Sequence, residues 1–368
     1  MTSHATRWNA SSAAKGRADS VDGPPNVPAA GGLKHSLRIA ASLALSAVFL
    51  WIAVRGVSWS ETKTALGSAR LGYVVPIFVM AIVSLYCRAL RWGVLLKPLA
   101  RVPPGSLFSA TAMGFAANML LPLRAGEVLR PWLLARKERL RLAPVMATVA
   151  VERLFDMATL LLFFGVATLT LPLPPEWRRY GWVFLATFIV FLVGLGLLLR
   201  FPHSTVAALD KVLTPLPSTV SAPVLHGVHH FTDGLGSLKS VAAIALAVAY
   251  SLAVWLTLSV TFGLGLSALD LPVPKIRGAL SLTTMVAIAV AVPGGPGFIG
   301  MFQVGCEVGL AVYGIGKSLA FSYSVLVHVL QFASTVLPGL YFFLRENLTL
   351  SELRTEASIA TGGESTEG

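Results

Sequence analysis

The chain contains a series of long apolar segments that are almost free of charged side chains. They lie at residues 37–54, 71–87, 105–123, 143–171, 180–199, 241–268, 278–292, 298–315 and 318–344. A helix needs roughly 20 apolar residues to cross the hydrocarbon core of a bilayer, and several of the segments are long enough. They lack the alternating pattern of a membrane barrel. Because backbone polar groups in lipid must be satisfied within the segment, the sequence predicts an all-α, polytopic integral membrane bundle.

The composition supports this class. Charged residues make up 12% of the chain, whereas a soluble domain has roughly a quarter. The formal net charge of +12 raises nucleic-acid binding as an alternative. However, the basic residues flank apolar segments and form no stripe on a soluble domain, so no nucleic-acid partner is expected.

Three regions follow from the pattern. Residues 1–36 are rich in Ser, Ala, Gly and Pro and are expected to form a disordered tail. Residues 37–344 are expected to form the membrane domain, and residues 345–368 a second polar, disordered tail. Because no cleavage site follows the first apolar segment, it is interpreted as an uncleaved span.

The placement of Lys and Arg predicts the topology, because cytoplasmic loops carry an excess of these residues. Residues 88–101 and 124–141 are both basic and are expected in the cytoplasm. The apolar segment 105–123 between them therefore starts and ends on one side, as a re-entrant hairpin does. Asn118 and Pro122 fit a broken helix near its tip that lines a polar cavity.

A second interrupted element lies in the C-terminal half. Segments 278–292 and 298–315 are short for a crossing, and the Pro and Gly residues at 293–297 break the helix between them. Interrupted segments at corresponding places in two halves point to an inverted-repeat transporter with a site near the bilayer midplane. We therefore expect two re-entrant pairs on opposite faces and about six full crossings, with both termini in the cytoplasm of a cell (inner) membrane protein. The expected crossings are 37–54, 71–90, 143–171, 180–199, 241–268 and 318–344. A plain count of eight or nine crossings is the alternative.

Ionisable side chains in apolar segments are the main candidates for function, because a charge at mid-bilayer costs about 2.5–3.5 kcal/mol. Arg124, Glu127 and Arg130 recur at every third position and are expected to share one helical face. This face is net positive, and a planar guanidinium group suits a phosphate or another anion. The alternative is that the two arginines only anchor the loop at the lipid headgroups.

A second charged group lies near the start of a long apolar segment and consists of Glu152, Arg153 and Asp156. Glu152 and Asp156 are four residues apart, so they face the same side of a helix. We expect Arg124 or Arg130 to pair with these carboxylates in a buried network, which would offset most of the cost of burying the charges. Such a network would serve either the substrate path or only the fold, and the sequence favours neither.

Four sequence elements occur in a specific order. They are Arg88-x-x-Arg91-Trp92, Asn118-x-x-Leu121-Pro122-x-Arg124-x-Gly126-Glu127-x-x-Arg130, Glu152-Arg153-x-x-Asp156 and Pro296-Gly297-x-x-Gly300. In order and spacing they resemble the lysylphosphatidylglycerol synthase transmembrane-region family, over most of residues 37–344. The resemblance implies a helical membrane domain with re-entrant elements that moves lipids or lipid-linked molecules between leaflets. It also implies that Arg88, Arg91, Pro296, Gly297 and Gly300 belong to the substrate site.

One position departs from the family pattern. The family usually has Glu three residues after the last Gly of the late motif, and here this residue is Gln303. Glu307 lies one turn later and is the candidate replacement. If Glu307 does not replace the missing Glu, an anion-binding or hydrogen-bonding role of this site is favoured over a proton- or cation-dependent role. Some relatives carry a soluble aminoacyltransferase domain, but only a short tail follows residue 344, so lysyl transfer is not expected.

No cofactor and no metal site are expected. His226, His230 and Asp233 have a metal-like spacing, but three ligands on one exposed helix make a poor preformed site, and a polar surface is the preferred interpretation. The sequence lacks a P-loop, a nucleophile elbow and a His-Glu-x-x-His element.

The sequence thus predicts a lipid flippase-like membrane protein that binds an anionic or phosphate-bearing lipid headgroup. Two alternatives stay open. One is a membrane-embedded enzyme that uses Glu152 or Asp156 as an acid or base on a lipid-linked substrate, although transport without covalent change is favoured. The other is a non-transporting partner in envelope lipid or glycolipid biosynthesis. The sequence names neither the lipid, the direction of transport, the energy source nor the oligomeric state, and a homo-oligomer is one of the open arrangements.

Overall fold

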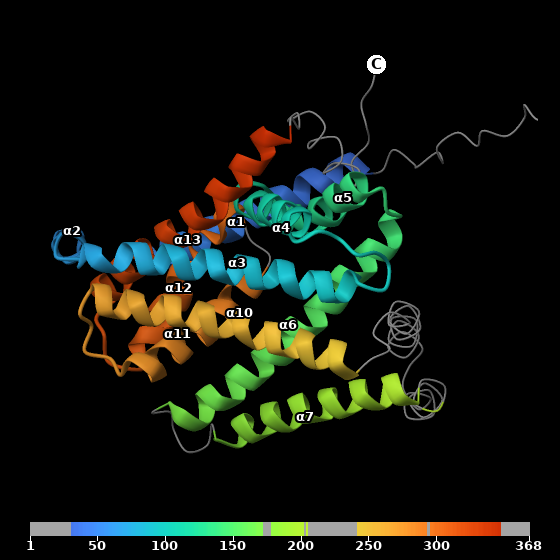
Figure 1. Cartoon of the computed structure of the whole chain (residues 1–368). Coiled ribbons are helices and arrows are strands. Elements are labelled where there is room, and N and C mark those ends of the chain that lie inside the picture. Colours follow the sequence, from blue (N-terminus) through green and yellow to red (C-terminus); the bar gives the residue numbers. More distant parts are fainter. Residues whose placement is uncertain (1–30, 172–177, 202–203, 205–240, 293–294, 347–368) are drawn as a thin grey trace, which may run out of the picture.

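The computed structural model describes residues 31–171, 178–201, 204, 241–292 and 295–346, which form helices and no strand (Figure 1). The all-α class is therefore confirmed for this part of the chain. The helices of the first half are α1 (Gly31–Val54), α2 (Trp59–Gly67), η1 (Leu71–Tyr73), α3 (Val74–Leu96), α4 (Pro104–Leu120), η2 (Pro122–Arg124), α5 (Gly126–Glu138), α6 (Leu142–Thr170) and α7 (Arg178–Arg200). Those of the second half are α10 (Val241–Ala268), α11 (Lys275–Ala291), η4 (Pro296–Phe298), α12 (Met301–Ala311) and α13 (Lys317–Arg345).

Three helical segments in the described ranges are long and apolar enough to cross a bilayer. They are Leu71–Leu96, Ala242–Ala268 and Lys317–Arg345. A fourth candidate is the pair Ile39–Val54 and Trp59–Gly67, which is bent by 84°. The other two expected crossings coincide with α6 and α7, which are helical but do not meet the same test. Helix length and apolarity thus support a polytopic helical membrane protein, whereas they leave the count of six crossings unestablished.

The first hairpin consists of α4 and α5, which pack together on either side of the break at η2. The two helices approach closely at a pair of glycines. A Cβ atom on Gly126 would lie 1.8 Å from the carbonyl oxygen of Gly114. Small residues let helix backbones come this close, which is a common packing device in membranes.

The return helix α5 forms most of the basic stretch 124–141, whose expected cytoplasmic side stays a prediction. Residues 126–138 fold back along α4. Leu129 and Leu133 are buried in a core cluster that also contains Trp92. Sequence analysis missed α5 because the helix is amphipathic and its charges mask the apolar face. The first interrupted element is therefore α4, η2 and α5, and not the apolar segment alone.

The second hairpin, α11 and α12, agrees with the expected interrupted pair. Two glycines allow the break, because Gly297 (φ 68°) and Gly300 (φ 86°) adopt backbone angles that other residues rarely tolerate. A Cβ atom on Gly305 would lie 2.8 Å from Cα of Val286, so this hairpin is also packed through a glycine.

The two halves repeat the same order of contacts. The pairs α3–α4, α4–α5 and α5–α6 have counterparts in α10–α11, α11–α12 and α12–α13. Helices α3 and α10 pack against each other, and each hairpin also contacts a long helix of the other half, α4 with α13 and α11 with α6. Two of the paired elements match in length, since α4 and α11 each have 17 residues and α6 and α13 each have 29.

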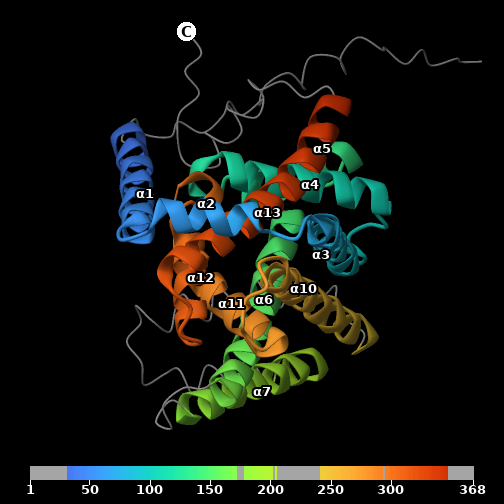
Figure 2. The same cartoon turned by 90° about the vertical axis from the view of Figure 1, so that its left-hand side faces the viewer.

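The periphery carries large exposed apolar side chains. Helix α7 lies at the edge of the bundle beside α6 (Figure 2), and its Trp182 and Val190 are 64% and 70% exposed. Apolar surfaces of this kind are suited to contact lipid or another protein. At the N-terminal edge, α1 begins at Gly31, so the helix starts inside the stretch that was expected to be a disordered tail.

Candidate functional site

A network of charged side chains is buried between α3, α5 and α6. The Nη2 atom of Arg91 donates to Oε1 of Glu152 at 2.8 Å, and its Nη1 donates to Oδ1 of Asp156 at 2.7 Å. On the other side, Nη1 of Arg130 donates to Oε2 of Glu152 at 2.8 Å. The expected pairing of a carboxylate with Arg124 or Arg130 is therefore confirmed for Arg130. Charge-assisted, paired hydrogen bonds of this length are the strong class of hydrogen bond.

The centre of the network is buried. Arg91 and Glu152 are 0% exposed and Arg130 is 2% exposed. The guanidinium group of Arg130 stacks 4.0 Å from the ring centroid of Trp92. The hydrogen bonds of Arg91, Arg130 and Glu152 join α6 to α3 and α5, although Nε of Arg91 and both Nε and Nη2 of Arg130 have no partner. The expected substrate contacts of these three residues stay a prediction.

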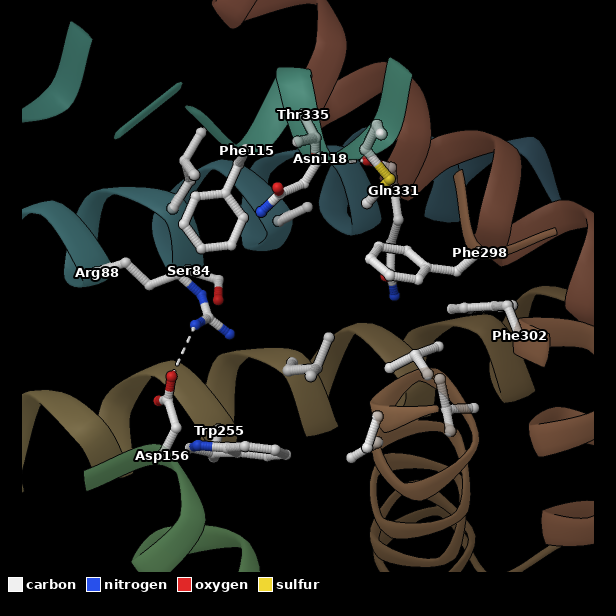
Figure 3. A pocket seen from close by; sticks show the side chains of 18 of the residues that line it. Ser84, Arg88, Phe115, Asn118, Asp156, Trp255, Phe298, Phe302, Gln331 and Thr335 are labelled. Carbon is white, nitrogen blue, oxygen red and sulfur yellow. Dashed lines mark hydrogen bonds and ion pairs between the residues drawn. The ribbon is translucent and has the colours of Figure 1, made fainter. Parts of the chain in front are cut away.

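A cavity of about 450 Å³ lies next to this network, a size typical of ligand sites. Helices α3, α4, α5, α6, α10, α11, α12 and α13 all contribute to its wall, together with the 3-10 turns η2 and η4. Figure 3 shows Arg88 pointing into it, facing Asp156. The predicted site residues that line the cavity are Arg88, Asn118, Arg124, Glu127, Arg153 and Asp156.

The charged groups of the cavity wall are held more loosely than those of the buried network. Asp156 Oδ2 lies 3.7 Å from Nη1 of Arg88 and 3.3 Å from Nη1 of Arg153. Glu127 Oε1 lies 3.6 Å from Nη1 of Arg124 and 3.9 Å from Nε of Arg153. Three of these side chains, Arg124, Glu127 and Arg153, are about one-third exposed (31–34%). They are therefore accessible to a ligand.

The charges of the wall and the network do not balance. Five guanidinium groups face three carboxylates, which leaves two positive charges in excess. The groups are Arg88, Arg91, Arg124, Arg130, Arg153, Glu127, Glu152 and Asp156. Because unpaired charge is costly away from water, this site favours an anion.

Arg124 lies where the tips of the two hairpins meet. Its Nη2 donates to the carbonyl oxygen of Val290 on α11, and its guanidinium carbon is 5.4 Å from the ring centroid of Phe298 on η4. Arg124 and Phe298 both have a φ of 55°. Non-glycine residues in this region cost about 1–3 kcal/mol and gather at functional sites.

The break at η2 also corrects the predicted helical face. Arg124 precedes α5, whereas Glu127 and Arg130 belong to it. The three residues therefore share no continuous helix. Glu127 reaches the cavity and Arg130 reaches the buried network.

The uncharged part of the wall is aromatic and amide-rich. Phe298, Phe302 and Gln331 lie on the side of the cavity away from Arg88 (Figure 3). Trp255 forms part of the opposite wall, on α10. Sequence analysis identified none of these four residues. For Gln331 a signal existed, since a side-chain amide within the apolar segment 318–344 is costly in lipid unless it faces a partner or a cavity.

Comparison with known proteins decides the family. The family model described as "Lysylphosphatidylglycerol synthase TM region" matches residues 39–339. The chain belongs to this family. A curated relative, "Glycosyltransferase AglD" of Haloferax volcanii, is 28% identical over 135 residues, which are 36% of this chain and 22% of the relative. The matched stretch thus spans about a fifth of that protein's length.

Gln303, where the resemblance to the family leads us to expect a Glu, braces the second hairpin. Gln303 Oε1 accepts a hydrogen bond from the backbone N of Gly300 at 2.7 Å, and its Nε2 lies 3.0 Å from Nδ1 of His328. Nε2 of His328 lies 2.8 Å from the carbonyl oxygen of Gly297. A carbonyl can only accept, so His328 donates through Nε2 and accepts from the Gln303 amide through Nδ1. Gln fits here because a carboxylate has no proton to donate to a neutral imidazole.

The remaining late-motif candidates also lie outside the cavity wall. Pro296, Gly297 and Gly300 shape the turn that carries Phe298 into the wall. Oε2 of Glu307 lies 3.7 Å from Nζ of Lys317. These residues and Gln303 shape or brace the second hairpin, and their expected substrate contacts stay a prediction.

The metal-like group falls outside the described residues, since His226, His230 and Asp233 lie within residues 205–240. Within the described ranges, no group of three or more His, Cys, Asp or Glu side chains is placed to hold a metal ion.

Proposed function

We propose that the protein binds an anionic, phosphate-bearing lipid headgroup in the cavity and moves the lipid between leaflets. The observation that carries this proposal is the excess of positive charge in the wall of a cavity within a helical membrane protein, where three arginines face only two carboxylates, Glu127 and Asp156. A phosphate accepts hydrogen bonds from the planar forks of arginines and completes the charge balance.

The arginines of the wall have donors to spare for a ligand. The Nε atoms of Arg124 and Arg153 have no hydrogen-bond partner, although both are buried. Their ion-pair distances of 3.3–3.9 Å exceed the 2.7–2.8 Å of the buried network. A phosphate oxygen could accept from these unpartnered Nε donors without displacing a strong bond.

The location of the cavity supports transport over catalysis. It lies where two broken helical hairpins meet, which is where inverted-repeat transporters bind substrate. Of the two acidic candidates for catalysis, Glu152 is sealed in the network and only Asp156 lines the cavity. The similarity to a glycosyltransferase favours a second candidate function, that of a partner in glycolipid biosynthesis.

The membrane arrangement proposed with this function has six crossings and two re-entrant hairpins in an inverted repeat, with both termini in the cytoplasm of the cell membrane. It is supported by the matching contact order and helix lengths of the two halves. In this arrangement the connection after α5 faces the cytoplasm and the connection before α11 faces outward.

Cysteine accessibility tests this topology. In a variant with Cys87 and Cys306 replaced by Ala, Ile276→Cys should react with an impermeant thiol reagent added to whole cells, because Ile276 is 86% exposed. Lys137→Cys should react only after the membrane is opened. Reaction of position 137 from outside would overturn the proposed re-entrant model of the first half.

Lipid movement in liposomes tests the function. Purified protein should speed the transbilayer movement of labelled anionic phospholipids at least about tenfold more than that of a zwitterionic phospholipid, because the cavity carries excess positive charge. Recovered lipid should be chemically unchanged. A covalently altered lipid, formed only when Asp156 is intact, would support the enzymatic alternative and contradict the proposal.

A further inference from the structure

Besides the arginines, two buried uncharged donor groups in the cavity wall have no hydrogen-bond partner. They are Nε1 of Trp255 and Nε2 of Gln331. Trp255 is 7% exposed, so its indole is almost closed to bulk water. Figure 3 shows Gln331 reaching into the cavity from one side, with the Trp255 ring on the opposite side. Buried donors are nearly always paired, so a ligand acceptor is expected near each of them.

The same wall also offers acceptors. The hydroxyl groups of Ser84, Thr261 and Thr335 line the cavity, and each donates its proton to a backbone carbonyl. A hydroxyl oxygen that has donated its proton still has lone pairs that accept. Asn118 adds an amide oxygen, Oδ1, that has no partner. A ligand must therefore both donate and accept to satisfy this wall.

Hydroxyl groups meet this requirement, whereas a phosphate oxygen only accepts and an ammonium group only donates. The rings of Phe298 and Phe302 provide apolar faces for the carbon atoms that bear the hydroxyls. We propose that the headgroup carries a polyol or sugar beyond its phosphate, so that the substrate class is a lipid phosphodiester of a hydroxyl-rich group. This inference rests on the proposed function, because it assumes that the wall arginines hold the phosphate.

Equilibrium binding to the purified full chain in detergent tests the inference. The probes are short-chain phosphatidylinositol, a short-chain polyprenyl glycosyl phosphate and short-chain phosphatidylethanol. All three are phosphodiesters of one negative charge, but only the first two carry hydroxyls on the headgroup. We expect at least one hydroxylated probe to bind about tenfold or more tightly than phosphatidylethanol, since several hydrogen bonds distinguish them.

Two variants connect this preference to the wall. Trp255→Phe removes the indole donor and keeps an aromatic ring, and Gln331→Leu removes the amide. Each should weaken binding of the preferred probe about three- to tenfold, the effect of one neutral hydrogen bond, and leave phosphatidylethanol unchanged. Trp182→Phe, on the exposed face of α7, is the matched control and should change neither.

The outcomes separate the two proposals. Equal affinity for hydroxylated and unhydroxylated probes would overturn the polyol or sugar assignment and leave anion binding in place. Parental affinities in both variants would also overturn it, because water would then satisfy the two donors. Failure of all three probes to bind would overturn the proposed function and this inference together.

Discussion

The Glu152→Leu variant is expected to lose about 3–5 kcal/mol of unfolding free energy, because it leaves buried cations without their carboxylate. Arg130 loses the ion pair to Glu152, and Arg91 keeps only Asp156 as an acidic partner. Native proteins are stable by about 5–15 kcal/mol, so the loss is a large part of the total. Thermal unfolding in detergent is the measurement, followed by reaction of the buried thiol of Cys306 with a dye in a Cys87→Ala background.

A second substitution distinguishes the loss of the ion pair from poor packing of the new leucine as the cause of the lower stability. Adding Arg130→Leu to Glu152→Leu removes both partners, and well-packed apolar replacements of buried ion pairs are often neutral or stabilising. The double variant should therefore unfold at a higher temperature than Glu152→Leu alone. If the second change lowers stability further by its own full cost, the two residues are not coupled and the network has been misassigned.

An exposed ion pair provides the matched control. Arg70 and Asp270 lie 2.9 Å apart, with side chains 57% and 69% exposed. Asp270 has a φ of 52°, which Asn tolerates well, so Asp270→Asn removes charge without adding backbone strain. The expected loss is below about 1 kcal/mol, as for most surface ion pairs.

The helices and their breaks were predictable because their signals are local. Apolar segments of sufficient length and the Pro and Gly residues near 122 and 296 mark them directly in the sequence. The partnership of Arg130 and Glu152 was also predictable, since a charge buried in a membrane protein requires a partner. The rule does not say which of several arginines is the partner.

The division of the charged residues between network and cavity depends on geometry that spacing does not encode. The three-residue spacing of Arg124, Glu127 and Arg130 places them together only if one helix carries all three. Arg124 has a left-handed backbone conformation, which interrupts the helix, so one helix does not carry all three residues. The sequence contains the Pro that starts the turn, but not the contact with Val290 that holds Arg124 against the other hairpin.

The uncharged wall of the cavity could not be assembled from sequence because it is purely tertiary. Trp255 and Gln331 belong to different helices, and Asn118 comes from the other half of the chain. Asn118 and Gln331 are polar residues in apolar segments, but neither the sequence nor its spacing indicates that they lie near Trp255. Their unpaired polar atoms form one binding wall only because the packing of α4, α10 and α13 places them around the same cavity.

The Arg124→Lys variant is expected to remain folded and to lose about ten- to a hundredfold of its activity in anionic lipid transport, which corresponds to one charge-assisted hydrogen bond of about 1.5–3 kcal/mol. Lys keeps the charge but lacks the planar fork that binds two phosphate oxygens. The measurement is the rate of lipid movement in liposomes, with dye reaction of Cys306 as the check on folding.

The control for this variant is Arg101→Lys, which changes an exposed arginine that does not line the cavity. It should transport at the parental rate. Lys at position 124 retains a donor for the carbonyl oxygen of Val290, so the contact between the hairpins is preserved while the fork is lost. Transport at the parental rate by Arg124→Lys would therefore rule out phosphate recognition by the guanidinium group. Arg124 would then be a structural link between the two hairpins, and the remaining wall arginines, Arg88 and Arg153, would have to bind the headgroup.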